Sequence, residues 1–265
     1  MSFLLVAEMD PVAGCQRNNV KDKLSRDKPV YSVTVQLVRS IVIASIARTV
    51  GFDSIYIDLE RSGISLDAAA QICVACLGLG IARFVPVPSV EPHFVGCMPS
   101  ASGTIAPHLR SAEDAKVIVR AAKYPTLKKR SLAGMLLQLH SRTFLAAELN
   151  DTTMVVTMFE CAEALAAFDE IAVVPGIDIL FIGTNDLCSS LGIPSEPDHE
   201  LVRDGYRRAF AAYRTHNKTL GIGGLASRPD LTKHFVTLRA RYVPMGTDLS
   251  FLAGASRQKR EQGAL

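Results

Sequence analysis

The chain has 265 residues, of which 48% are hydrophobic, enough to bury the core of one large domain such as an α/β barrel. Its 29 basic and 26 acidic side chains give a net charge of +3, and the basic residues are scattered along the sequence. This distribution argues against a nucleic-acid partner, since proteins that bind nucleic acids gather basic residues on one face.

The sequence does not predict a membrane segment or a targeting signal. A membrane span needs roughly 18 to 20 consecutive apolar residues, and no stretch reaches that length. The N-terminal MSFLLVAEMD has no basic region ahead of its short apolar run. We therefore expect a cytoplasmic protein without a membrane partner. Its cysteines should be reduced, and Cys73 and Cys76, despite their C-x-x-C spacing, should pack inside a buried helix.

Short β-branched runs alternate with helix-length segments, a pattern typical of βα units with a parallel sheet. The predicted strands are 31–36, 53–59, 82–87, 103–108, 153–159, 177–182, 220–224 and 241–245. Eight such units in a chain of this length favour a (β/α)8 barrel, the TIM barrel, over an open doubly wound sheet. The first strand is also not followed by a glycine-rich phosphate-binding motif.

Helices are predicted between these strands, with recognisable ends. The predicted segments are 38–51, 66–80, 111–125, 161–176 and 198–217. Gly51 and Gly80 are typical helix-ending residues, and Ser111 with Asp114 forms a capping pattern at a helix start. The pattern therefore predicts a regular succession of strand and helix.

One long connection, residues 126–151, interrupts this succession, and a loop of that length is usually functional or disordered. We expect a single barrel domain over residues 1–265, with residues 1–18 and 255–265 at its periphery. The charged end of the chain, SRQKREQGAL, is expected to be a frayed tail.

Active sites of this fold lie at the carboxyl ends of the strands and on the loops that follow. The polar residues there are Gln36, Asp58, Glu60, Arg61, His108, Arg110, Glu160, Thr184, Asn185, Asp186, Thr247 and Asp248. Burying a lone carboxylate is costly, so convergence of Glu160 and Asp186 would imply a cation between them. Oxygen ligands with room for water suit Mg²⁺, Mn²⁺ or Co²⁺. Helix capping is the alternative for both acids, and the pattern alone does not choose between the two.

Other residues at the strand ends also have two interpretations. His108 is a candidate ligand for substrate or cation, although a single histidine at a strand end is more often a hydrogen-bonded structural residue. Arg110 directly precedes a helix and is expected to be solvated. The glycines of GIGG, residues 221–224, permit either close approach of a ligand or tight packing of the barrel.

Five stretches, in order along the chain, resemble the HpcH/HpaI aldolase family. They are GFDSIYIDLE (51–60), IAPHLRSAEDAKVIVRAAKYP (105–125), MFE (158–160), GIDILFIGTNDL (176–187) and RARYVPMGTDL (239–249). The resemblance covers about residues 19–253. The family comprises class II, metal-dependent 2-oxo acid aldolases, includes macrophomate synthase and is related to the citrate lyase β-subunit.

The resemblance implies a barrel that forms a homo-oligomer, a trimer or a hexamer, commonly through swapped C-terminal helices. It also implies that Glu160 and Asp186 bind a divalent cation, which stabilises the enolate of a small 2-oxo acid such as pyruvate or oxaloacetate. Backbone amides around residues 184–186 would bind the substrate carboxylate. The residues that we assign to substrate binding are Thr184, Asn185, Gln36 and His108.

Two positions depart from the family pattern. Where the family has a histidine paired with the aspartate that matches Asp58, this chain has Arg61, and the family's substrate-polarising arginine matches Pro86. The nearby Arg83 is an odd number of residues away, so strand alternation places it on the opposite face. Because arginine stays protonated, Arg61 is no general base, and losing one typically removes about 10² to 10⁴ of rate.

Our leading prediction is a divalent-metal-dependent carbon–carbon lyase, an aldolase, that acts on a 2-oxo acid through a pyruvate enolate. Arg61, Asp58 and Glu60 are its predicted catalytic residues, with the proton taken by metal-bound water or by one of the two acids through water.

Three alternatives remain open at this stage. The first is an oxaloacetate-type decarboxylase, in which Arg61 pairs with a substrate carboxylate and no proton is abstracted. The second is hydrolysis of an acyl thioester, and the third is a catalytically silent barrel with a binding or scaffolding role. The structural alternative for Arg61 itself is an ion pair with Asp58 or Glu60.

Overall fold

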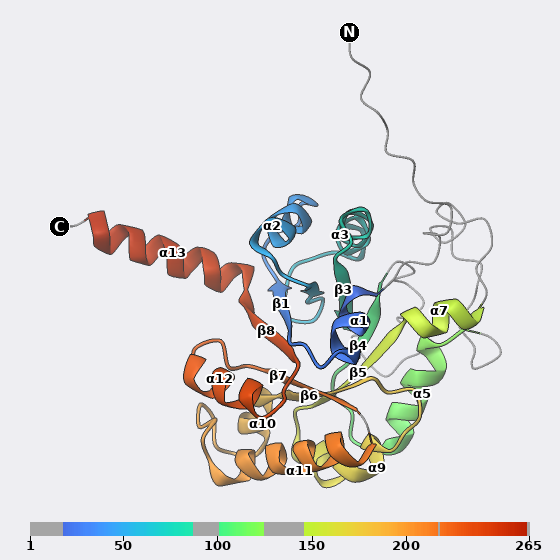
Figure 1. The fold of residues 1–265 in the computed structure, drawn as a ribbon. Helices are drawn as coiled ribbons and strands as arrows, with labels where there is room; N and C mark the ends of the chain where they lie inside the picture. The colour runs from blue at the N-terminus through green and yellow to red at the C-terminus, as the bar shows by residue number, and fades with distance from the viewer. Residues whose placement is uncertain (1–17, 87–100, 125–145, 217, 264–265) are drawn as a thin grey trace.

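The structure, a computed structural model, describes residues 18–86, 101–124, 146–216 and 218–263. Within these residues, eight parallel strands close into a barrel in chain order, and β8 pairs with β1 (Figure 1). They are β1 (Val30–Val35), β2 (Ser54–Ile57), β3 (Ala82–Pro86), β4 (Gly103–Ala106), β5 (Met154–Phe159), β6 (Ile179–Gly183), β7 (Thr219–Gly223) and β8 (Tyr242–Thr247). The predicted (β/α)8 barrel is confirmed, and the predicted strand ends differ by at most two residues among those described.

The strands are covered on both faces, which explains their nearly continuous apolar sequences. Every residue of β5 and β6 is buried. Phe84, Phe181 and Tyr242 pack together in one hydrophobic cluster, in which the rings of Phe84 and Phe181 each contact the ring of Tyr242. Two further clusters join the strands to the surrounding helices. The barrel interior is therefore a packed core, and a ligand is expected at the strand ends.

Helices surround the barrel. They are α1 (Asn19–Ser25), α2 (Val42–Val50), α3 (Leu66–Leu79), α5 (Ala112–Ala122), α7 (Ala146–Thr152), α8 (Ala162–Ala166), α9 (Phe168–Ala172), α10 (Thr184–Ser190), α11 (Glu200–His216), α12 (Pro229–Thr237) and α13 (Asp248–Gly263). Gly51 ends α2 with a φ of 93°, and Gly80 ends α3 with a φ of 67°, values that favour glycine. Ser111 and Asp114 form the predicted capping box of α5. Among the described helices, none has both the length and the hydropathy of a membrane span.

Two local expectations need correction. Residues 161–176, predicted to be helical throughout, form the short helices α8 and α9, because Ala167, with φ −87° and ψ 15°, leaves helical geometry between them. Residues 256–263, expected to be a frayed tail, continue α13, which projects away from the barrel (Figure 1). Residues 1–17 and most of the long connection 126–151 lie outside the described residues, and α7 occupies the end of that connection.

Cys73 and Cys76 are free thiols buried in α3, which confirms the packing interpretation. Burial raises the pKa of Cys73 to about 12 and the pKa of Cys76 to about 11. Arg83, buried in β3, lies close enough to both thiols for their charges to interact. The side chain of Arg83 therefore points toward α3, as strand alternation predicted. Cys15 and Cys97 lie outside the described residues.

Candidate active site

Eight of the twelve polar residues predicted at the strand ends line a cavity of about 210 Å³ at the mouth of the barrel. They are Gln36, Asp58, Glu60, Arg61, Glu160, Asn185, Asp186 and Thr247. They belong to strands β1, β2, β5, β6 and β8 or to the loops and helix that follow these strands. The closed barrel thus brings together residues that lie up to 211 positions apart in the sequence, as the numbers of Gln36 and Thr247 show.

Glu160 follows the last residue of β5 and is only 3% exposed. Its Oε1 accepts the backbone N–H of His108 at 2.7 Å, whereas its buried Oε2 has no hydrogen-bond partner. Burial raises the pKa of this carboxyl group, although the His108 backbone N–H and the His108 side chain act against the shift. The N-cap of α8 is Cys161, so Glu160 does not cap that helix, and the capping alternative is wrong for this residue.

Arg61 lies between the two predicted metal ligands. Its Nη2 donates to Oδ2 of Asp186 at 2.6 Å and lies 3.8 Å from Oε2 of Glu160. Burial lowers the pKa of Arg61, but the hydrogen bond and charge of Asp186, together with Glu160, outweigh it and raise the pKa overall. Among the described residues, the carboxylates within ion-pair distance of this guanidinium are Glu160 and Asp186. The structural alternative for Arg61, an ion pair with Asp58 or Glu60, is therefore not found among the described residues; the ion pairs are with Asp186 and Glu160.

Asp58 is occupied by other contacts. Its Oδ1 accepts the backbone N–H groups of Glu60 and Arg61, each at 3.0 Å, and its Oδ2 accepts the side-chain amide of Gln36 at 2.7 Å. An aspartate that binds backbone N–H groups two and three residues ahead stabilises a turn. Asp58 thereby shapes the loop that carries Glu60 and Arg61, and it also orients Gln36 toward the cavity.

His108 adjoins the cavity without lining it. Its Nε2 lies 2.6 Å from Oε1 of Glu60, and its Nδ1 lies 3.1 Å from Oε1 of Glu160. The residue has a φ of 55°, which is unusual for a side chain other than glycine, and this conformation also directs its backbone N–H at Glu160. His108 thus connects the acid at the end of β5 to the acid on the loop after β2.

Thr184 and Asn185 begin α10, but their side chains differ in accessibility. Thr184 is fully buried, and its hydroxyl pairs with the Tyr206 hydroxyl at 2.6 Å, behind the cavity. Asn185 lines the cavity directly. Gly224, with a φ of 76°, lies so close that a Cβ there would come within 2.9 Å of the Asn185 backbone nitrogen. Gly221 packs against the Phe181 ring in the same manner, so both contacts favour the packing interpretation of GIGG, while Gly223 and Gly224 also line the cavity.

The sequence did not predict Tyr56 at the site, and it placed Asp248 at a strand end without predicting its partners. Tyr56 lines the cavity, and burial, followed by the charge of Asp58, raises the pKa of its phenol well above the usual value. Asp248, the first residue of α13, accepts the backbone N–H groups of residues 36–38 at 2.7 to 3.2 Å. Its only sequence signal is an acidic residue directly after the last strand. Asp248 therefore holds the loop that positions Gln36.

The donor set fits a hard divalent cation that keeps water or substrate oxygens as its remaining ligands. Glu160 and Asp186 both approach the same guanidinium, and the buried Oε2 of Glu160 is left without a hydrogen bond. Among the described residues, no cluster of three or more His, Cys, Asp or Glu side chains is spaced to hold a metal ion. The protein would thus supply two carboxylates, too few for a closed structural zinc site.

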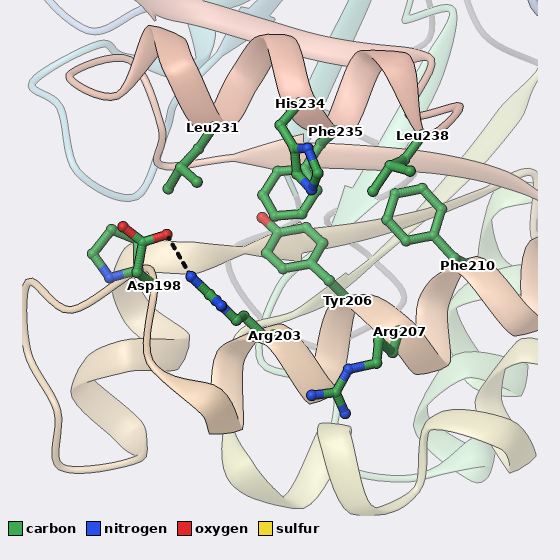
Figure 2. A pocket seen from close by; sticks show the side chains of 10 residues that line it. Asp198, Arg203, Tyr206, Arg207, Phe210, Leu231, His234, Phe235 and Leu238 are labelled. Carbon is green, nitrogen blue, oxygen red and sulfur yellow. Dashed lines mark ion pairs between the residues drawn. The ribbon is translucent and has the colours of Figure 1, made fainter.

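A larger cavity of about 460 Å³ lies on the outside of the barrel, between α11 and α12 (Figure 2). Its aromatic wall is formed by Tyr206 and Phe235, whose rings stack with centroids 3.9 Å apart. Arg203 pairs with Asp198, and Arg207 turns away to pair with acidic residues of its own helix. This outer cavity is lined by one carboxylate, that of Asp198, whereas four carboxylates line the smaller cavity at the strand ends. The smaller cavity is therefore the better candidate for chemistry.

A closed parallel barrel with facing acids at its strand ends defines the chain as a TIM barrel with an acidic, ligand-accessible mouth. The family model described as HpcH/HpaI aldolase/citrate lyase matches residues 38–255, and the chain belongs to this family.

Relatives and solved structures agree with this assignment. The chain is 32% identical to 4-hydroxy-4-methyl-2-oxoglutarate aldolase tasA of Hapsidospora irregularis, over 89% of this chain and 91% of that protein. It is 29% identical to 4-hydroxy-4-methyl-2-oxoglutarate aldolase cghB of Chaetomium globosum, over 90% and 92% respectively. A HpcH/HpaI aldolase/citrate lyase family protein from Burkholderia cenocepacia J2315 superposes with a TM-score of 0.85 at 25% identity, covering 94% of this chain and all of that one.

Proposed function

We propose that the protein is an aldolase that releases pyruvate from a 4-hydroxy-2-oxo acid, with a divalent cation, Mg²⁺, Mn²⁺ or Co²⁺, bound by Glu160 and Asp186. The observation that supports this proposal most is that the two carboxylates line one cavity and that the buried Oε2 of Glu160 has no hydrogen-bond partner. The two relatives named above are both 4-hydroxy-4-methyl-2-oxoglutarate aldolases, which makes this dicarboxylic acid the first substrate to test.

In the proposed reaction, the carbon–carbon bond beside the hydroxyl-bearing carbon breaks. The hydroxyl group gives up its proton and becomes a carbonyl, and the electron pair of the broken bond passes to the pyruvate enolate. The enolate then takes up a proton and leaves as pyruvate. A divalent cation, when bound, supplies Lewis-acid stabilisation of the negative charge that develops on the 2-oxo acid.

Glu60 is the proposed acceptor of the hydroxyl proton. It lines the cavity, and its side chain is 30% exposed, whereas the Asp58 carboxylate is already occupied by backbone N–H groups and an amide. His108, 2.6 Å from Glu60, holds that carboxylate toward the mouth of the barrel. Asn185 and Gln36, which both line the cavity, would orient the substrate, and backbone amides around residues 184–186 are proposed to bind its carboxylate.

Arg61 is proposed to bind the distal carboxylate of the substrate, because a guanidinium can pair with a carboxylate through two parallel hydrogen bonds. The same residue favours a second candidate function, decarboxylation of an oxaloacetate-type acid. Arg61 stands where the family has a histidine and cannot accept a proton, and loss of CO₂ yields the same enolate without proton abstraction.

We also propose a homo-oligomer in which a second copy covers α13. Beyond its first residue, every residue of this helix through Gly263 is exposed, including Leu249, Phe251 and Leu252. Neighbouring α2 exposes Val42 and Ile46 as well. Exposed apolar side chains on two adjacent elements are typical of a surface that another chain covers.

Aldol cleavage is tested by incubating EDTA-treated protein with 4-hydroxy-4-methyl-2-oxoglutarate and added Mn²⁺, with pyruvate measured through lactate dehydrogenase. We expect metal-dependent pyruvate release, and a loss of about hundredfold or more in kcat/KM for Glu160→Gln. The matched control is Glu163→Gln, which removes an exposed acid three residues further along and should leave the rate unchanged.

A parallel assay follows deuterium entry into the methyl group of pyruvate. Exchange would show that the site can abstract a proton from pyruvate and form its enolate. The decarboxylase is tested separately, since it would release pyruvate and CO₂ from oxaloacetate in a metal-dependent reaction without requiring exchange. An absence of both aldol cleavage and oxaloacetate decarboxylation at saturating Mn²⁺ would contradict both enzymatic functions and favour a silent barrel.

A further inference from the structure

The guanidinium of Arg61 occupies the space between the carboxylates of Glu160 and Asp186. Its Nη2 lies 2.6 Å from Asp186 Oδ2 and 3.8 Å from Glu160 Oε2, the buried oxygen that has no hydrogen-bond partner. These are the oxygens that face the cavity and would bind a cation. A positive group of the chain itself is therefore already located between them.

We propose that Arg61 and a divalent cation compete for this position, so that metal binding requires the guanidinium to leave. The inference rests on the metal site of the proposed function and adds a regulatory role for one residue of this chain. A divalent ion and a guanidinium within about 4 Å of each other repel strongly at the reduced dielectric of a protein mouth. Both cannot occupy the oxygens of Glu160 and Asp186 together.

The surroundings of Arg61 allow such a displacement. Its side chain is 48% exposed, so the guanidinium can swing toward solvent or toward a substrate carboxylate. The backbone of Arg61 is held separately, since its N–H donates to Asp58. The Glu160 carboxylate is also held independently, through Oε1 and the His108 N–H. The Glu160 carboxylate and the loop would therefore remain in place while the arginine side chain moves, and the backbone of Asp186 would stay on α10.

A competing arginine has a measurable consequence for metal affinity. Replacing Arg61 by glutamine removes the guanidinium charge from between the two carboxylates, so a divalent cation should bind more tightly. After screening by solvent and salt, we expect the Kd for Mn²⁺ to fall by about tenfold. Arg61→Lys keeps the charge, so its Kd should stay closer to that of the unmodified protein.

The test is titration of the metal-free full-length protein with Mn²⁺, measured by loss of the free-ion EPR signal and by calorimetry. Arg110→Gln is the matched control, because it removes the same charge from an exposed position near the same mouth. We expect Arg61→Gln to tighten binding about tenfold while Arg110→Gln changes it less than about threefold. Thermal unfolding of each variant without metal checks that it folds.

Each remaining result has a defined meaning. If Arg61→Gln binds Mn²⁺ no more tightly than Arg110→Gln, or more weakly than the unmodified protein, Arg61 does not compete with the metal. That result would leave the proposed metal site itself unaffected. If Mn²⁺ binds but Glu160→Gln leaves the affinity unchanged, the ion lies elsewhere, and both the metal site and the competition are wrong. Failure of the unmodified protein and Arg61→Gln to bind Mn²⁺ at all overturns both as well.

Discussion

The side chain of Asp248, directly after the last strand β8, binds the loop that follows the first strand β1. The residue is buried, and its two carboxylate oxygens accept N–H groups from the loop after β1. Hydrogen bonds to a charged acceptor are worth more than neutral ones, and leaving buried donors unpaired adds a penalty. This contact fixes the loop in which Gln36 faces the cavity.

Replacing Asp248 by alanine should lower the free energy of unfolding by about 2 kcal/mol or more, because several N–H groups lose their acceptor. Urea denaturation followed by circular dichroism measures the change. Asp22→Ala, at an exposed position in α1, is the control and should stay within about 0.5 kcal/mol. Equal effects of the two substitutions would contradict a special role for Asp248.

Tyr206 supports the start of α10 behind the cavity through its hydrogen bond with Thr184. Removing its hydroxyl in Tyr206→Phe leaves the Thr184 hydroxyl without its described partner, and should cost about 1 kcal/mol of stability. Because Thr184 begins α10, the KM for substrate should also rise, while metal affinity remains unchanged. Tyr213→Phe on the same helix, α11, is the comparison variant, and a cost as large as that of Tyr206→Phe would contradict the argument.

At the scale of elements, α3 shows how packing determines the chemistry of a residue pair. Cys73 and Cys76 have a spacing associated with redox or metal motifs, but the helix turns both into the core. Burial disfavours the thiolate, the form that reacts or binds a metal. The element therefore makes these thiols inert.

We expect native protein treated with iodoacetamide at pH 8.5 to remain unmodified at Cys73 and Cys76, whereas the partly exposed Cys161 reacts before either of them. Both buried thiols should react once urea is added. Peptide mass spectrometry reads out each site. Rapid labelling of Cys73 in the native state would show that α3 does not hold its thiols in the core.

The same thiols should affect stability in alkali. The native pKa of Cys73, about 12, exceeds the ordinary thiol value of 9.0. Above pH 9, Cys73 therefore loses its proton in the unfolded chain but keeps it in the native state. The unfolded state then binds fewer protons, and the free energy of unfolding falls as pH rises from about 9 toward 12. In Cys73→Ala this fall should be shallower, as urea denaturation over that pH range would measure; an identical slope would contradict the assignment.

At the scale of the whole molecule, α13 is exposed along its length after Asp248 and does not pack on the barrel beyond its first turn. It projects from the body (Figure 1), and Phe251 contacts the body through a stacked pair with Phe52 at 6.1 Å between ring centroids. A helix with exposed apolar residues and few contacts to its own chain gains little stability alone. A second copy would supply the missing contacts.

Replacing Leu252 by glutamate should shift the protein toward monomer, because a charge would enter the proposed contact. Analytical ultracentrifugation or light scattering after gel filtration measures the mass. Ser256→Glu adds the same charge at an exposed polar position of α13 and should perturb the assembly less. A protein that is already monomeric without either substitution would contradict the proposed oligomer.

The sequence by itself determined the barrel, since β-branched runs and amphipathic segments report burial on both faces of the strands, and this pattern is local. It also placed Glu160 and Asp186 at strand ends, because the residue that follows an apolar run is visible in the chain. Gly51, Gly80 and the Ser111 cap could be predicted for the same reason: turn and cap chemistry depends on adjacent residues.

Only the tertiary structure decided which partners these residues have. Arg61 pairs with Asp186 rather than with Asp58 or Glu60, although the latter two are neighbours in the chain. The Thr184 hydroxyl turns to Tyr206, and Asp248 binds the loop after β1, more than 200 residues away. The contacts of Arg61 and Asp248 arise when the barrel closes and brings distant strand ends together, and the contact of Thr184 arises when α11 packs against α10. The order of residues along the chain does not give the distance between two charges that become neighbours only when the barrel closes.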